Sequence, residues 1–230
     1  MTDPARTTST FRPRYITFDC YGTLIDFQMH TLTRTLLADR LDPARMPVFL
    51  TDFSAYRFDE VLGPWKPYAE VIETALRRCC QRWGASYRDA DGQQLYEAVP
   101  TWGPHSDVPS ALATLAREFP LVILSNASDG QIGDNVARLG APFHAVYTAE
   151  QALAYKPRLK PFEYMIDRLG CDPSDLLHVS SSLRYDLMSA HDVGIRHCAY
   201  IERGHGPSTS YYGHPTLKDL GQLPALVGLK

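Results

Sequence analysis

The sequence lacks the features of several large classes of protein. No apolar run among its 230 residues approaches the roughly 18–20 residues that a transmembrane helix needs. The 23 basic residues stand against 26 acidic ones, so the charge balance does not point to a nucleic-acid partner. The N-terminal segment is polar and has no apolar centre of the kind that marks a secretory signal. We therefore expect neither a membrane nor a nucleic acid as a partner.

Cysteine is scarce and shows no regular spacing. The chain has five cysteines, an odd number, with no CxxC pair and no histidine–cysteine cluster. We expect these thiols to be reduced and mostly buried, which fits a cytoplasmic location. Cys20 directly follows an aspartate of interest, but no suitably placed histidine lies nearby in sequence, so a cysteine nucleophile is not expected.

What is present is an ordinary globular composition with an α/β pattern. Hydrophobic residues make up 44% of the chain and charged residues 21%, and the length suffices for a core domain plus a small cap. Strands and helices alternate in the second half, which predicts a doubly wound parallel sheet. The expected strands are the first half of residues 14–26, then 121–124, 143–147, 176–179 and 197–201, and the expected helices of this part are 108–118, 129–139, 160–169 and 186–193.

A block of helical pattern interrupts this order. Leucines recur at three- and four-residue steps from Leu32 to Leu41, and candidate helices follow at residues 49–62 and 67–83. Helices inserted into an α/β pattern suggest a separate cap. We therefore expect a core domain formed by residues 1–25 and 100–230, and a helical cap domain formed by residues 26–99.

The chain is organised around residues 14–26, a predicted buried strand followed by a turn. Asp19 stands where the strand ends, and open parallel sheets bind ligands at the carboxyl ends of their strands. Ser125-Asn126, Lys156 and the 180–186 loop, which contains Asp186, also lie just past strands or in connecting loops. A turn or a helix cap could explain each of them alone. Together they predict one active site.

The residues Phe18-Asp19-x-Tyr21-Gly22-Thr23-Leu24-x-Asp26 resemble the first motif of the haloacid dehalogenase superfamily, in its L-2-haloacid dehalogenase branch. The later polar groups follow in the order of that family, whose core is Rossmann-like. The resemblance implies that Asp19 is a nucleophile that attacks a substrate carbon, and that Lys156 holds its charge. A carboxylate can act in this way only if it is ionised and desolvated.

The resemblance also implies roles for further residues. It assigns hydrogen bonds with the nucleophile or the substrate carboxylate to Thr23, Ser125 and Asn126, and gives Asp186 the task of holding Lys156 or a water. Arg57 resembles the cap arginine that reaches over the nucleophile, although a surface ion pair with Asp59 or Glu60 would also explain it. The residues expected to line the substrate pocket are Tyr21, Arg57, Trp65, Tyr68, Trp102, Ser181, Ser182 and Tyr185.

The chain departs from the family at several positions. Tyr21 and Ser182 stand where phosphatases of the superfamily carry acidic residues. The remaining carboxylates are too few for a good magnesium site, and the acid that would protonate a phosphate ester's leaving oxygen is missing. We therefore expect neither a metal nor another cofactor. Leu183 and Phe162 replace an asparagine and a tyrosine of the best-known dehalogenases, which leaves water positioning and substrate choice open.

These features predict a hydrolase that displaces a substituent from C2 of a small 2-substituted carboxylate through an aspartyl ester. A halide is the simplest leaving group. A close second is the opening of L-azetidine-2-carboxylate by the same attack, which needs a proton donor that the sequence does not name. A magnesium-dependent phosphatase or a non-catalytic binding protein would also be compatible with the fold. The resemblance also favours a homodimer.

Overall fold

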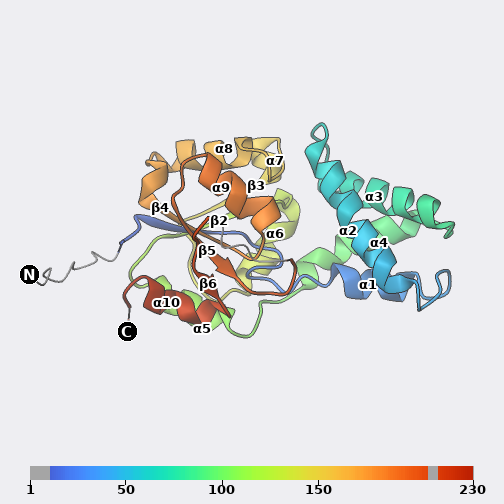
Figure 1. The fold of residues 1–230 in the computed structure, drawn as a ribbon, viewed down its shortest axis with the longest axis horizontal. Coiled ribbons are helices and arrows are strands. Elements are labelled where there is room, and N and C mark those ends of the chain that lie inside the picture. The colour runs from blue at the N-terminus through green and yellow to red at the C-terminus, as the bar shows by residue number, and fades with distance from the viewer. Residues whose placement is uncertain (1–10, 207–211, 230) are drawn as a thin grey trace, which may run out of the picture.

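A fully parallel sheet of six strands forms the centre of the protein (Figure 1). The computed structural model describes residues 11–206 and 212–229. The strand order is β3-β2-β1-β4-β5-β6, and every neighbouring pair is parallel. The strands are β1 Tyr15–Phe18, β2 Leu121–Ser125, β3 Ala145–Thr148, β4 Leu176–Ser180, β5 His197–Ile201 and β6 Thr216–Leu217. The predicted α/β fold is confirmed.

Helices cover both faces of this sheet, which explains why its central strands β1, β2 and β4 are buried at every position. Side chains of one face, among them Ile16, pack in a core with α5 and α10. Side chains of the other face, among them Val122, pack with α8 and α9. The helices of the sheet domain are α5 Val108–Leu115, α6 Asp129–Ala137, α7 Ala149–Ala152, α8 Lys160–Leu169, α9 Met188–Asp192 and α10 Leu223–Leu226.

Two parts of the sheet domain differ from the prediction. The expected helix at residues 186–193 begins instead as a π-helix, Leu183–Leu187, that continues into α9. The amides of Asp186 and Leu187 both donate to the Ser182 carbonyl at 3.2 Å, and Asp186 is fully buried. Such turns are rare and often lie at functional sites. The tail contributes β6 and α10, which are too short, at 2 and 4 residues, to leave a readable pattern.

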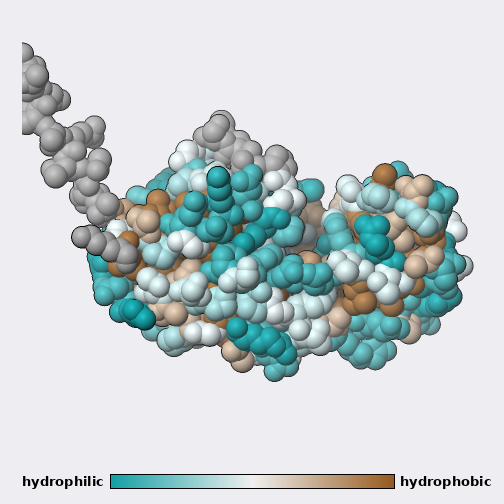
Figure 2. Space-filling model, turned by 90° about the horizontal axis from the view of Figure 1, so that it is seen from below, coloured by the Kyte–Doolittle hydropathy of each residue, from teal (hydrophilic) through white to brown (hydrophobic). Residues whose placement is uncertain are grey.

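Four helices form a second body beside the sheet domain, which we call the helical lobe (residues 29–98; Figure 1). Figure 2 shows a notch in the molecular surface between the two bodies. The helices are α1 Met29–Leu36, α2 Met46–Leu62, α3 Tyr68–Trp83 and α4 Asp89–Ala98. In the described ranges no helix is both long and apolar enough to cross a bilayer.

The sequence predicts no separate helix at α4, because this segment is polar and contains a glycine. The structure supplies a reason for that glycine. A Cβ atom at Gly92 would lie 3.1 Å from the Cα atom of Glu73 on α3. Glycine therefore lets α4 approach α3 more closely than any other residue would.

A buried ion pair connects the segments of the lobe. The Arg40 guanidinium donates to both carboxylate oxygens of Asp91, at 2.7 and 3.0 Å, and the two side chains are only 7% and 4% exposed. Arg40 also donates to the Ser86 carbonyl at 2.9 Å, and the Arg88 amide donates to Asp91 at 3.1 Å. These bonds tie the segment after α1 to the start of α4.

Removing Asp91 leaves the buried Arg40 guanidinium with the half-exposed Asp39, 3.1 Å from its Nε, as its remaining carboxylate partner. Asp91→Ala is therefore expected to lower the free energy of unfolding by about 3–5 kcal/mol. The control is Glu73→Ala, which removes the exposed pair of Glu73 with Arg77 and should cost at most about 0.5 kcal/mol. Chemical denaturation measures both values, and equal losses would contradict the role given to the buried pair.

Candidate active site

The carboxyl ends of the central strands gather the polar side chains expected there. The chain leaves β1 towards β2 and β3, and then returns to β4 on the other side of β1. The strand order therefore reverses between β1 and β4, where open α/β sheets bind ligands. Asp19 directly follows β1, and the segment from Ser181 to Asp186 directly follows β4.

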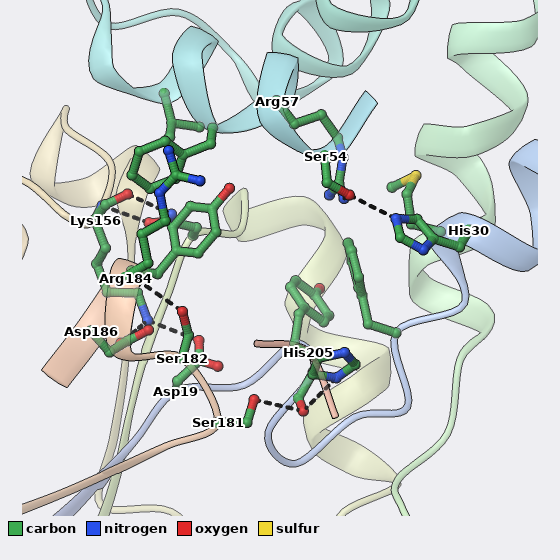
Figure 3. Close-up of a pocket in the computed structure, with 18 of the residues that line it drawn as sticks. Asp19, His30, Ser54, Arg57, Lys156, Ser181, Ser182, Arg184, Asp186 and His205 are labelled. Carbon is green, nitrogen blue, oxygen red and sulfur yellow. Dashed lines mark hydrogen bonds and ion pairs between the residues drawn. The ribbon is translucent and has the colours of Figure 1, made fainter. Parts of the chain in front are cut away.

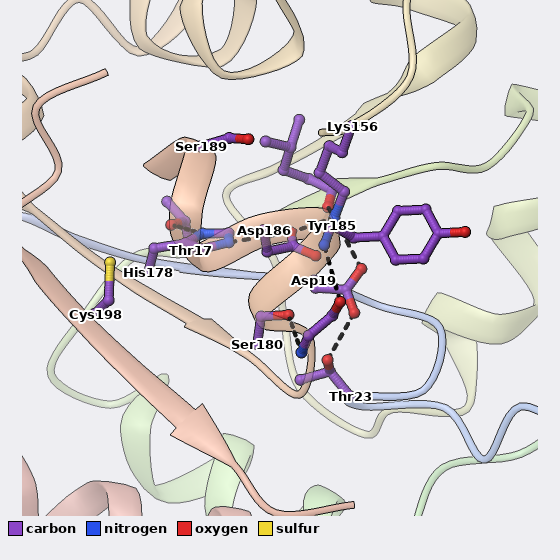
Figure 4. A network of polar contacts seen from close by, with 12 residues as sticks. Thr17, Asp19, Thr23, Lys156, His178, Ser180, Tyr185, Asp186, Ser189 and Cys198 are labelled. Atoms are coloured by element: carbon purple, nitrogen blue, oxygen red, sulfur yellow. Dashed lines mark hydrogen bonds and ion pairs between the residues drawn. The ribbon is translucent and has the colours of Figure 1, made fainter. Parts of the chain in front are cut away.

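Lys156 joins the two carboxylates at this edge. Its Nζ lies 2.8 Å from Oδ1 of Asp19 and 2.6 Å from Oδ1 of Asp186, and it donates a third bond of 2.7 Å to the Leu124 carbonyl (Figure 4). Three acceptors thus satisfy the three ammonium protons. Lys156 and Asp186 are 1% and 0% exposed, whereas Asp19 is 7% exposed and faces a cavity.

The charges of this group shift all three pKa values. Burial and the nearby Asp186 raise the pKa of Asp19 more than Lys156 and the Thr23 hydroxyl lower it. Burial also raises the pKa of Asp186, but Lys156 and His178 outweigh it, so this pKa is lowered. Burial lowers the pKa of Lys156, and the two carboxylates raise it more strongly. Asp186 is therefore the firmly ionised carboxylate of this group, and Asp19, which faces the cavity, is the more basic one.

The loop after β1 is fixed around Asp19. Thr23 Oγ1 donates to Oδ2 of Asp19 at 2.6 Å, as the resemblance implies, and accepts from the Ser181 amide at 2.9 Å. Ser181 Oγ donates to the Gly22 carbonyl at 2.9 Å. Gly22 has φ +88°, and a Cβ there would lie 3.3 Å from Nε2 of His205. Both facts favour glycine at this turn.

Asn126 lines the cavity and hydrogen-bonds the backbone of Lys156. Its side-chain amide donates to the Lys156 carbonyl at 2.9 Å, and its Oδ1 accepts from the Lys156 amide at 2.8 Å. Asn126 therefore positions the lysine backbone and leaves the contact with Asp19 to Thr23. Ser125 ends β2, and its buried Oγ faces the cavity with no hydrogen-bond partner among the described residues. That hydroxyl can serve a ligand.

A cavity of about 720 Å³ lies between this edge of the sheet and the helical lobe (Figure 3). The group of Asp19, Lys156 and Asp186 forms one side of it, and Arg57 and Ser54 of α2 form the opposite wall. Most of the side chains that the sequence analysis assigns to the site line this cavity. They are Asp19, Tyr21, Arg57, Tyr68, Ser125, Asn126, Lys156, Ser181, Ser182, Tyr185 and Asp186.

Arg57 faces the cavity without an ion pair to any described carboxylate. Asp59 and Glu60, the acidic neighbours that could have paired with it, pair with Arg78 instead. Nη2 of Arg57 donates to Ser54 Oγ at 3.2 Å, and its buried Nε has no hydrogen-bond partner among the described residues. The guanidinium therefore retains donors for an anionic group in the cavity.

Several cavity residues are not identified by the sequence analysis. His30 and His205 both line the cavity, and Nε2 of His205 lies 3.2 Å from the Gly22 carbonyl. Arg184 lines it as well, with its guanidinium 3.6 Å from the centre of the Phe58 ring. Arg184 lies within the predicted 180–186 loop, which is a usable signal. The histidines reach the cavity through the packing of distant segments, which no local pattern reveals.

Trp102 is a correction to the predicted set, because it does not line the cavity. Its ring packs edge-on against Phe27 at a centroid distance of 5.0 Å, and Phe27 is the residue that faces the cavity. Trp65 also lies elsewhere, stacked on Tyr155 at 4.9 Å. Both tryptophans serve as packing residues, as large aromatic side chains commonly do.

The remaining predicted lining residues are held by contacts of their own. The Tyr21 hydroxyl donates to Oδ1 of Asn135 at 3.0 Å. Ser182 Oγ accepts from the Tyr185 amide at 3.0 Å and so caps the π-helix. The Tyr185 ring packs edge-on against Phe58 at 4.9 Å. These contacts give the cavity a defined, partly aromatic wall.

The same contacts decide whether the magnesium ion of the superfamily's phosphatases would fit. The Lys156 ammonium already bridges the carboxylates of Asp19 and Asp186. Tyr21 and Ser182 add no carboxylate. Within residues 11–206 and 212–229, no group of three or more His, Cys, Asp or Glu side chains could hold a metal ion. The residues present do not fit a magnesium site.

Cys20 is not suited to nucleophilic attack. It is fully buried, and burial together with Asp19 raises the pKa of its thiol. A thiol that stays protonated is a poor nucleophile. All five cysteines are free.

Comparisons with known proteins identify the family of the chain. A family model of haloacid dehalogenase-like hydrolases matches residues 13–194. The chain is 28% identical over 191 residues to an (S)-2-haloacid dehalogenase from Pseudomonas sp. strain YL, with 80% of each chain covered. It is 23% identical over 227 residues to a pyrophosphatase from Bacillus velezensis, with 94% of this chain and 96% of the relative covered.

Solved structures show the same fold. One is the L-2-haloacid dehalogenase from Xanthobacter autotrophicus with chloropropionic acid covalently bound, which has a TM-score of 0.77 and 22% identity over 95% of this chain and 100% of that one. The family match spans most of the chain, including the segments that carry Asp19, Lys156 and Asp186. The chain belongs to the haloacid dehalogenase-like hydrolase family.

Proposed function

We propose that the protein is a hydrolase that displaces a substituent from C2 of a 2-substituted carboxylic acid, most simply a halide. One observation supports this above the others. The carboxylate of Asp19 faces a cavity whose opposite wall carries Arg57, an arginine with no carboxylate partner in the described parts of the chain. Arg57 would bind the substrate carboxylate and thereby hold C2 against Asp19.

The first step is attack of an Asp19 oxygen on C2, with the C2–halogen bond breaking and its electron pair leaving on the halide. The carboxylate must be ionised for this, and Lys156 supplies a charge partner at 2.8 Å. Burial raises the pKa of Asp19, so its ionised form is more basic than an ordinary aspartate. Little exposed surface remains, which limits the water that would otherwise solvate the nucleophile.

The second step is attack of water on the carbonyl carbon of the aspartyl ester. The bond from that carbon to the ester oxygen breaks, so Asp19 keeps the solvent oxygen and the 2-hydroxy acid leaves with the former Asp19 oxygen. Oδ2 of Asp186 is buried without a hydrogen-bond partner among the described residues, and it can orient the water. Only the first step changes C2, so net inversion is expected.

The same attack could open the ring of L-azetidine-2-carboxylate. The departing nitrogen then needs a proton, and the imidazoles of His30 and His205 line the cavity. Burial and Arg57 lower the pKa of His30, which leaves this ring largely unprotonated near neutral pH. His205 is the other imidazole at the cavity, with its Nε2 3.2 Å from the Gly22 carbonyl.

Hydrolysis of a phosphate ester is less well supported, although a pyrophosphatase is among the relatives. Tyr21 occupies the sequence position at which the resemblance places the phosphatases' second aspartate, its hydroxyl donates to Oδ1 of Asn135, and burial raises its pKa. A phenol of that kind is a poor substitute for a carboxylic acid that protonates a leaving oxygen.

A product assay in the presence of a chelator tests the proposal. L-2-chloropropionate, chloroacetate and L-azetidine-2-carboxylate are offered in parallel to the wild type and to Asp19→Asn. We expect the wild type to release chloride and Asp19→Asn to release none. Ring opening without chloride release would favour the azetidine as substrate. Turnover of an aryl phosphate alone, with added magnesium, would overturn the proposal.

The covalent intermediate predicts where solvent oxygen goes. In water labelled with oxygen-18, a single turnover with enzyme in excess should give unlabelled product and a labelled Asp19, because the product hydroxyl comes from the carboxylate. Mass spectrometry of the product and of the peptide that contains Asp19 measures both. Label in the product of the first turnover would rule out the ester.

Arg57→Gln removes the charge that we assign to the substrate carboxylate. We expect kcat/KM for L-2-chloropropionate to fall about 10–100-fold, mostly through KM, because a charge-assisted hydrogen bond contributes about 1.5–3 kcal/mol. Arg77→Gln, an exposed arginine of α3, is the control and should leave both constants unchanged. An unchanged KM in Arg57→Gln would mean that the carboxylate binds elsewhere.

A further inference from the structure

Behind Asp186, two polar side chains lie in the otherwise apolar layer between the sheet and α8–α9. The row of residues that crosses four neighbouring strands at this level is Val122, Thr17, His178 and Cys198. Thr17 and His178 are both 0% exposed. An imidazole in such a layer costs free energy unless its nitrogens are hydrogen-bonded.

Both ring nitrogens of His178 have a partner. Nε2 lies 3.2 Å from Oδ1 of Asp186, and Nδ1 lies 2.8 Å from Oγ1 of Thr17 (Figure 4). An ionised carboxylate can only accept, so the proton belongs on Nε2. The Thr17 hydroxyl, which also lies 3.4 Å from the Leu177 carbonyl, can then donate to Nδ1 at the shorter distance of 2.8 Å and so supports this tautomer. A continuous chain of contacts thus runs from Thr17 in the core to Asp19 at the cavity.

We propose that His178 is a positioning residue that holds Oδ1 of Asp186 from behind, so that the Lys156 ammonium remains shared with Asp19. Lys156 and His178 are the two side chains that donate to the Asp186 carboxylate among the described residues. Without His178, the lysine would be the sole donor to a fully buried carboxylate and would be drawn towards it. This inference rests on the proposed function, which gives Asp19 and Asp186 their tasks.

The neighbouring Phe162 offers His178 an apolar contact from α8. Its ring lies edge-on to the imidazole at a centroid distance of 5.4 Å. A phenyl ring brings no hydroxyl to this layer. The polar contact with Asp186 on this side therefore comes from the strand, through His178, and not from α8.

The charged surroundings support this assignment. The titratable groups that face Asp186 and His178 are Asp19, Lys156, Tyr185, Cys198 and His214. Burial raises the pKa of Cys198 to about 12, so this thiol brings no charge near neutral pH. Burial lowers the pKa of His214, which favours the neutral form of this ring as well. Lys156 and His178 are thus the groups that keep Asp186 ionised.

The test compares His178→Phe with His178→Gln. Phenylalanine keeps a ring but removes the N–H group, whereas glutamine returns an amide N–H near the place of Nε2. In His178→Phe the Lys156 ammonium is drawn towards Asp186 and away from Asp19, so the pKa of Asp19, the more basic carboxylate and the nucleophile, rises. We expect the acid limb of the pH profile of kcat/KM to move up by about one pH unit, and kcat on the plateau to fall about tenfold. His178→Gln should recover most of both effects.

Two further variants separate positioning from packing. Thr17→Val removes the partner of Nδ1, and we expect a smaller shift of the acid limb in the same direction. Met165→Leu changes packing in the same apolar layer and should leave the acid limb unmoved. Thermal unfolding identifies variants that do not fold; if His178→Phe is one, His178→Gln and Thr17→Val carry the comparison. An unmoved acid limb in the folded His178 and Thr17 variants, or an equal shift in Met165→Leu, would overturn the proposal.

A measurement without turnover distinguishes this inference from the proposed function. Nitrogen NMR of the wild-type protein should show the His178 proton on Nε2, and Thr17→Val should weaken that preference. A proton on Nδ1 would overturn the inference even in an active enzyme. Inactivity on every proposed substrate with the proton on Nε2 would overturn the proposed function and leave the contact with Asp186 in place.

Discussion

The ammonium group of Lys156 is the interaction on which the site depends. Two carboxylates almost removed from water would repel each other strongly, and each would lose its hydration. One cation within 2.8 Å of both offsets these costs. The arrangement requires the ends of β1, β2 and β4 to meet, since the lysine also donates to the carbonyl of Leu124. Asn126 holds the lysine backbone on both sides and so keeps this meeting point in register.

The two walls of the cavity differ in how far their polar groups are satisfied. On the sheet side the buried polar atoms of the described cavity side chains have partners, except for the Ser125 hydroxyl and Oδ2 of Asp186. On the lobe side Arg57 keeps its Nε without a partner. A bound carboxylate would complete the hydrogen bonding of that wall, which makes the geometry better suited to an anionic ligand than to a neutral one.

The sheet and its functional edge could be predicted from the sequence, because apolar runs such as residues 121–124 and 176–179 end in polar residues. The contacts within the edge could be predicted only in part. Asn126 binds the Lys156 backbone, and Phe27 takes the place at the cavity that was expected of Trp102. His178 gave no signal, because a strand buried on both faces has no alternation from which a polar residue's direction can be read.

The cavity is built from two bodies that are stabilised by separate contacts. On one side the charge group around Lys156 is fixed by the sheet, and on the other the lobe has its own buried pair of Arg40 and Asp91. Arg57 and Ser54 of α2 make no hydrogen bond or ion pair with Asp19, Lys156 or Asp186 among the described contacts, so these two residues can be exchanged without removing a partner from the charges opposite them. In evolution, substitutions in the helical lobe can therefore change which ligand is bound while the charge group around Lys156 stays the same.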